Sequence, residues 1–164
     1  MTTLGSPALD RRTAWPTALA AAAMLLATML LLVGVERLTG RDVFALPFVA
    51  SVAVLAMAPR APLARPAAVL LSYPTCTAVA AAVTAVTGPS VTAATTATTA
   101  SVLVMLLLRT PHAPAAVCAA LVGLTAPGPL YVLHTVLPAA FVVTGAAVLC
   151  GRVLPAYGYP PTWR

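Results

Sequence analysis

The stretch Arg109-Thr110-Pro111-His112-Ala113-Pro114 interrupts a sequence that is otherwise almost entirely Ala, Val and Leu. It places a cation, a hydroxyl, an imidazole and two prolines between apolar segments. The apolar run that follows, Ala115–Leu124, is shorter than the roughly 20 residues that cross a bilayer. Because proline removes a backbone donor and disfavours helix at the preceding residue, the prolines separate this run from the segment before it. We therefore expect a short helix that starts inside a membrane.

The composition is that of an integral membrane protein. Of 164 residues, 61% are hydrophobic and 7% are charged, whereas soluble domains carry about 25% charged residues. The 9 cations are all arginines, against 3 acids, and they lie in short connections and at the ends, as membrane topology requires. No basic face is interleaved with aromatics, so we expect the lipid bilayer as the partner and no binding of nucleic acid. A homo-oligomer is also possible.

Six apolar segments follow one another, and we expect an all-α transmembrane domain over residues 14–151. A polar arm (1–13) precedes it and an interfacial tail (152–164) follows it. The first segment is long and lacks a small-residue cleavage site, so we interpret it as a retained span rather than a signal peptide. The expected segments are 15–35, 43–58, 67–86, 91–108, 115–124 and 130–150.

The six segments form two halves of one design, about 14–87 and about 89–151. Each half has a long segment, a short segment interrupted by proline, and a second long segment, with Pro47 matching Pro114. Three segments per half make the two repeats inverted. Short, proline-interrupted segments at matching positions point to the binding site of a transporter near the membrane midplane. The short segments are therefore expected to be half-helices.

Arginine positions favour six crossings with both termini in the cytoplasm of a bacterium, in its inner membrane. With six crossings, seven arginines lie on one side and two on the other; with four crossings, the division is four against five. The positive-inside rule prefers the first arrangement. A re-entrant arrangement of the two short segments remains the alternative, because broken segments need not follow hydropathy.

The interrupted segments suggest how an anion could be bound. Helix N-termini carry about half a positive charge each, and two that converge form an anion site from backbone N–H groups. The spans contain no Asp, Glu or Lys, which argues against cation transport and proton relays through carboxylates. They also lack paired acid and base groups, so we expect no enzyme, no metal and no cofactor. The candidate substrate-binding residues are Pro47, Phe48, Ala50, Ser51, Arg109, Thr110, His112, Ala113 and Pro114.

Several of these residues have a plainer interpretation. His112 could serve only to cap a helix, and Arg109 could be a snorkelling residue at the interface. For Ser51 a binding role and a purely structural role both remain open. A row of threonines in the fourth segment predicts a hydroxyl-lined face, or else packing contacts between helices: Thr92, Thr95, Thr96 and Thr99. The aromatic residues of the tail are typical of an interfacial anchor: Tyr157, Tyr159 and Trp163.

Four motifs resemble the HPP family of small bacterial and plastid membrane proteins. Pro47–Ser51 resembles its P-F-G/A-A-S segment, and the loop Ala58–Pro66 resembles A-P…S-P-L-A-x-P. Arg109–Ala115 resembles R-T-x-H-P-P-A, and Tyr159–Trp163 is similar to Y-P…W. The chain departs from the pattern at Ala113, in place of a proline, and at residues 71–73, in place of Gly-Gly-His. The resemblance implies nitrite transport, since some members are implicated in it.

We therefore expect transport of a small monovalent inorganic anion, nitrite-like, through a site formed by the two half-helix N-termini. The alternative is a non-transporting membrane scaffold or accessory subunit, in which the prolines only shape packing. The two predict different junctions between the short segments. A polar cavity favours transport, whereas a junction filled by side chains favours the scaffold.

Overall fold

The fold is built from helices, and the described part of the chain contains no strand, as expected. The computed structural model describes residues 11–161, with side chains from 15 onward. Residues 1–10 of the predicted arm and residues 162–164 of the predicted tail, including Trp163, lie outside that part. The helices are α1 (Arg11–Thr39), α2 (Leu46–Met57), α3 (Pro66–Thr87), α4 (Val91–Leu107), α5 (Ala113–Thr125) and α6 (Leu137–Val153). Three short turns are η1 (Pro62–Ala64), η2 (Val132–Val136) and η3 (Pro155–Tyr157).

Three helices among the described residues are long and apolar enough to cross a bilayer: Trp15–Thr39, Pro66–Thr87 and Val132–Val153. The other three are shorter, with 12 residues in α2, 13 in α5 and 17 in α4. The shortness of α4 departs from the expected alternation of long, short and long segments. This helix ends at Leu107, and two residues later Arg109 adopts a positive φ of 57° that no helix continues.

Prolines set the beginnings of the helices, as the sequence predicts. α2, α3 and α5 each have a proline at the first or second helical position, where its missing N–H costs no hydrogen bond. The residue before α2, Ala45, is extended, with φ −75° and ψ 154°. α1 runs past the expected end at Val35, because Gly40 takes a positive φ of 65° and caps the helix by donating to the Glu36 carbonyl.

The last span contains a widened turn that the sequence analysis did not anticipate. Residues Val132–Val136 form a π-helical turn that leads directly into α6. Pro138 has no N–H to donate to the carbonyl of His134, four residues earlier. Arg41, in the connection between α1 and α2, donates to that carbonyl instead, at 3.0 Å. The turn therefore ties this end of α6 to the connection after α1.

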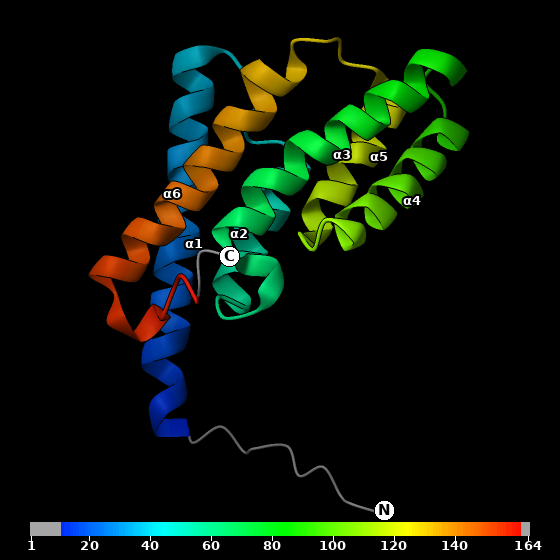
Figure 1. Cartoon of the computed structure of the whole chain (residues 1–164). Coiled ribbons are helices and arrows are strands. Elements are labelled where there is room, and N and C mark those ends of the chain that lie inside the picture. The colour runs from blue at the N-terminus through cyan, green and yellow to red at the C-terminus, as the bar shows by residue number, and fades with distance from the viewer. Residues whose placement is uncertain (1–10, 162–164) are drawn as a thin grey trace, which may run out of the picture.

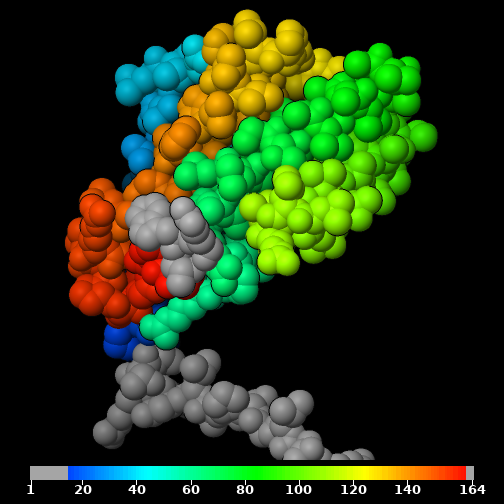
Figure 2. Space-filling model, in the orientation of Figure 1, coloured from blue at the N-terminus to red at the C-terminus, as the bar shows by residue number. Residues whose placement is uncertain are grey.

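The helices pack in two groups of three, and consecutive helices run in alternating directions (Figure 1). One group contains α3, α4 and α5, and the other contains α1, α2 and α6. Contacts of α3 with α6 and of α2 with α5 join the two groups. The space-filling view shows α3 (green) between α6 (orange) and α4 (yellow-green) across one face (Figure 2). The third helix of each half thus packs against the first two helices of the other half.

The threonine row of α4 forms a hydroxyl-lined face, as predicted. This face points outward, so the alternative of packing contacts between helices is wrong within this chain. All four of its members are exposed, whereas the opposite face buries Ala93, Ala94 and Ala97 against the other helices. Hydroxyls of this row bond to the helix's own carbonyls, as Thr95 does to Val91 at 2.9 Å. The row therefore neither lines an internal path nor packs α4 against its neighbours in this chain.

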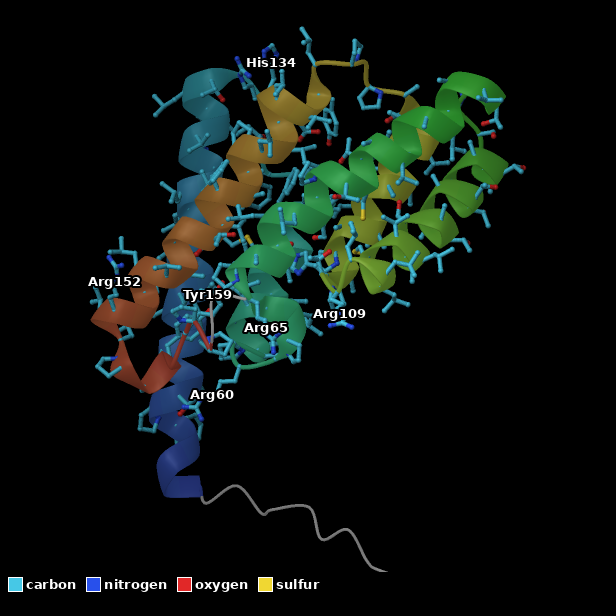
Figure 3. The ribbon with its side chains drawn as sticks, viewed as in Figure 1. Arg60, Arg65, Arg109, His134, Arg152 and Tyr159 are labelled. Carbon is cyan, nitrogen blue, oxygen red and sulfur yellow. The ribbon has the colours of Figure 1, made fainter. Side chains whose placement is uncertain are left out.

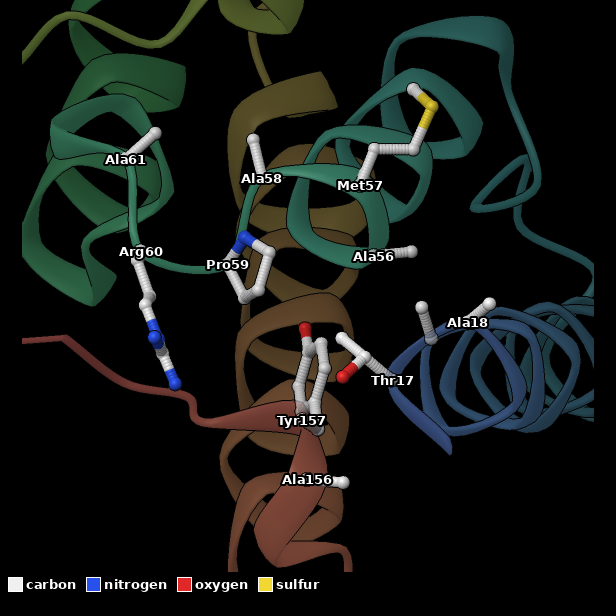
Figure 4. A pocket seen from close by; sticks show the side chains of 11 residues that line it. Thr17, Ala18, Ala56, Met57, Ala58, Pro59, Arg60, Ala61, Ala156 and Tyr157 are labelled. Carbon is white, nitrogen blue, oxygen red and sulfur yellow. The ribbon is translucent and has the colours of Figure 1, made fainter. Parts of the chain in front are cut away.

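The tail folds back on the protein, and its two described tyrosines, predicted as part of an interfacial anchor, pack inside it. Tyr157 and Tyr159 are buried, with 1% and 4% of their surfaces exposed. The Tyr157 hydroxyl donates to the carbonyl of Leu55 near the end of α2, at 2.8 Å. Tyr157 also lines a cavity of about 720 Å³ between the start of α1, the end of α2 and the tail, together with Arg60 (Figure 4).

Replacing Tyr157 with phenylalanine is expected to lower the free energy of unfolding by about 1 kcal/mol, because the Leu55 carbonyl loses its donor. Tyr131→Phe is the matched control, since the buried Tyr131 hydroxyl has no hydrogen-bond partner. Equilibrium unfolding in mixed detergent micelles measures both. Equal stability of Tyr157→Phe and the unchanged protein would show that the tail is not held by this bond.

Candidate functional site

The second turn of α2 and the residue before α5 meet at a direct contact between two side chains. Ser51 lies in the second turn of α2, and His112 is the residue immediately before α5. The Ser51 Oγ and His112 Nε2 atoms are 2.7 Å apart, and both side chains are fully buried. We call this contact the α2–α5 junction. It brings together two motifs that are 61 residues apart in the chain.

A tyrosine from α3 completes the α2 side of the junction. The Tyr73 hydroxyl lies 2.6 Å from Ser51 Oγ and donates to the carbonyl of Pro47 at 2.7 Å. Its ring lies beside those of Phe48 and His112, with centroids 5.1 Å and 5.6 Å away. Tyr73 is itself fully buried. The phenol therefore links the first turn of α2 to the imidazole at the start of α5.

The other nitrogen of His112 reaches the loop between α2 and α3. Nδ1 lies 2.8 Å from the carbonyl of Leu63, in η1. Both ring nitrogens are thus engaged, and the ring is held between two elements. The result is one continuous series, which we call the four-contact chain: Pro47 carbonyl, Tyr73 hydroxyl, Ser51 hydroxyl, His112 ring and Leu63 carbonyl.

The fold brings some of the predicted site residues together and leaves others apart. Pro47, Phe48, Ser51 and His112 converge, and Pro114 is buried at the start of α5. Thr110 is buried, and its hydroxyl has no hydrogen-bond partner. The remaining members lie away from the contact: Ala50 is half-buried, while Arg109 and Ala113 are exposed.

The charged side chains nearest to the junction along the chain are positive. The sequences of α2, η1, α3 and α5 contain no Asp or Glu, while Arg65 precedes α3 and Arg109 lies three residues before His112. Figure 3 shows Arg60, Arg65, Arg109 and Arg152 toward the end of the bundle where α1 begins, with His134 at the opposite end. This end of the bundle therefore carries an excess of positive side chains.

Open space lies beside the junction but not within it. A cavity of about 450 Å³ is bounded by the connection before α2, by Pro47 and by one face of α5. Its walls are mostly apolar, and the exposed Asp42 stands at its edge. Ser51, Tyr73 and His112 are themselves packed against one another. In this conformation the junction is filled by side chains.

Tyr73 and the Leu63 carbonyl are the two members of the four-contact chain that were not predicted from the sequence. A phenol in the middle of an apolar span was the available signal, because a hydroxyl there requires a partner inside the protein. The Leu63 carbonyl left no signal, since any residue in that loop supplies one. Its availability depends on the turn at η1, which only the folded structure defines.

Comparison with known protein families identifies a match over nearly the whole chain. The family described as HPP, transmembrane region, has a model that matches residues 10–160. No curated protein and no solved structure matches the chain. The matched range includes every element that contributes to the four-contact chain.

Proposed function

Because the chain belongs to the HPP family of transmembrane proteins, we propose that it moves a small monovalent anion across the bilayer at the α2–α5 junction. The observation that carries this proposal is the direct contact of Ser51 with His112 at the starts of two short helices. Such helix starts present unpaired N–H groups and a positive partial charge. They attract anions without requiring a charged side chain. Nitrite is the candidate substrate.

The packing supports an inverted repeat as the frame of this site. When α1, α2 and α3 are exchanged with α4, α5 and α6, the helix contacts map onto one another. α1 packs on α2 and α6, as α4 packs on α5 and α3. The contact of α2 with α6 maps onto that of α5 with α3, and the pairs α2 with α5 and α3 with α6 map onto themselves. In this frame α2 and α5 are paired half-helices near the midplane, as in transporters with inverted repeats.

The alternating directions of the helices support six crossings, with the arginine-rich end in the cytoplasm. Both termini are then cytoplasmic, and the membrane is the inner membrane of a bacterium. The junction has an imidazole and a phenol but no carboxylate beside them, so the proposal includes no enzymatic reaction. Transport requires the contact between Ser51 and His112 to open, because their side chains fill the junction.

Flux into liposomes tests the proposal. Purified protein in liposomes is expected to admit nitrite at least about tenfold faster than protein-free liposomes, with nitrate and formate compared in parallel. Protein-free liposomes are essential, because protonated nitrite crosses lipid unaided. If none of the three anions enters faster with the protein, the transport proposal is wrong.

A non-transporting scaffold is the second candidate, and the filled junction is the observation that favours it. In that case the four-contact chain only locks α2, α3 and α5 together. The scaffold predicts a stable protein with no anion flux. The same liposome experiment therefore separates the two functions.

A further inference from the structure

The four-contact chain is one proton short when His112 is neutral. A backbone carbonyl only accepts, a serine or tyrosine hydroxyl donates one proton, and a neutral imidazole donates one. Both ends of the chain are carbonyls, those of Pro47 and Leu63. Its contacts measure 2.7, 2.6, 2.7 and 2.8 Å. Four contacts need four protons, and Tyr73, Ser51 and neutral His112 supply three.

The directions of donation follow from the two ends. Tyr73 must give its proton to Pro47, so Ser51 must donate to Tyr73. Ser51 then has no proton left, and His112 must donate to it through Nε2. Because Nδ1 must also donate to Leu63, the complete chain requires both ring nitrogens of His112 to carry a proton.

A doubly protonated His112 would be a buried cation without a counter-charge from the protein. The ionisable side chains on the elements packed around it are Tyr73 and Cys76 of α3 and Cys118 of α5, and none of them is a carboxylate. The nearest charges along the chain are Arg65 and Arg109, which are also positive. A buried charge is costly unless it is paired, and the start of α5 adds to that cost.

A small anion supplies the missing charge. It would be attracted both by the imidazolium and by the start of α5. Thr110 lies two residues before His112 and is 8% exposed, and its buried hydroxyl has no partner, which makes this hydroxyl an available donor. Proton uptake and anion binding then strengthen each other, as linked equilibria must.

We propose that His112 binds one proton together with the transported anion, so that the protein carries the two as a neutral pair. The co-transport of the proton with the anion rests on the proposed transport function. The proton site itself follows from the four-contact chain. The substrate class is therefore a small monovalent anion that is taken up together with one proton on His112.

Nitrogen-15 NMR of His112 tests the proton site. The chain has 2 histidines, so His134→Gln protein, labelled with ¹⁵N-histidine and purified through a tag without histidine, gives one ring to observe. With nitrite at about pH 6, near the ordinary pKa of histidine, both ring nitrogens are expected to carry protons. A ring with a single N–H under these conditions would overturn the proposal.

Removing either hydroxyl gives a result that a purely structural role does not predict. In Ser51→Ala or Tyr73→Phe the remaining contacts are satisfied by a neutral ring, so one N–H is expected under the same conditions. Tyr131→Phe is the matched control and should leave the ring doubly protonated, because that hydroxyl has no partner. Identical ring signals in Ser51→Ala and the parent would contradict the proton count.

A proton-sensitive dye inside the liposomes tests the coupling. Nitrite entry is expected to bring one proton per anion above the protein-free background. Protein-dependent flux without proton entry would overturn the neutral pair while leaving transport intact. A doubly protonated ring without flux of any anion would instead refute transport and leave the proton site standing.

Discussion

Replacing His112 with alanine is expected to lower the free energy of unfolding by about 2–4 kcal/mol and to abolish anion flux. The imidazole is fully buried and joins the loop before α3 to α2. Hydrogen bonds inside membrane proteins contribute only about 0.6 kcal/mol on average. The void left by the ring is therefore the larger part of the loss in stability. The loss of flux has a separate cause, because the proposed function places the imidazole next to the anion.

His134→Ala is the matched control for this variant. His134 is exposed, and the bond that Arg41 makes to it uses the backbone carbonyl, which alanine keeps. Its stability should stay within about 0.5 kcal/mol of the unchanged protein, as is usual for surface positions. Unfolding in mixed detergent micelles and liposome flux are measured on both variants. A His112→Ala protein that folds and transports normally would remove His112 from the account.

Replacing Gly123 with alanine is expected to destabilise the protein by about 3 kcal/mol, because α4 and α5 would be forced apart. A Cβ at this position would lie 2.5 Å from the Cα of Ala94 and 2.7 Å from its nitrogen. These are backbone atoms, so no side-chain rotation relieves the overlap. The Gly123 carbonyl also accepts the N–H of Ser90 at 3.0 Å, and that bond would lengthen as the helices separate.

Gly145→Ala in α6 is the control for Gly123→Ala. A Cβ at Gly145 meets nothing within 4 Å, and alanine favours helix over glycine. Its stability should be unchanged or slightly higher. If the two glycine variants unfold at the same detergent ratio, the close approach of α4 and α5 does not exist in the folded protein.

The sequence was informative about where helices begin and which motifs matter. Prolines mark the starts of α2, α3 and α5, and the contact between Ser51 and His112 joins two motifs singled out by their departure from an apolar background. Such signals are local. They follow from the chemistry of proline and from the rarity of polar groups within a membrane.

The face that each helix buries could not be predicted. In water an apolar stripe identifies the buried side, but a helix face toward lipid is as apolar as one toward protein. The threonine row of α4 therefore did not reveal that its face points away from the other helices, because its hydroxyls bond within the helix and need no neighbour. The burial of Tyr157 was missed for a different reason. It depends on the Leu55 carbonyl near the end of α2. Pro59, four residues later, has no N–H to donate to that carbonyl, but the sequence does not indicate which distant side chain supplies the donor.

Nitrite flux through Ser51→Ala protein, compared with Ser101→Ala, is the most direct test of a path at the α2–α5 junction. Both serines are fully buried in helices, and each variant loses a single oxygen atom. Ser51 belongs to the four-contact chain, whereas Ser101 only bonds to the carbonyl of Cys76 at 3.4 Å. We predict that Ser51→Ala loses at least about nine-tenths of the protein-dependent flux and that Ser101→Ala keeps it. Equal flux through the two variants would contradict the account.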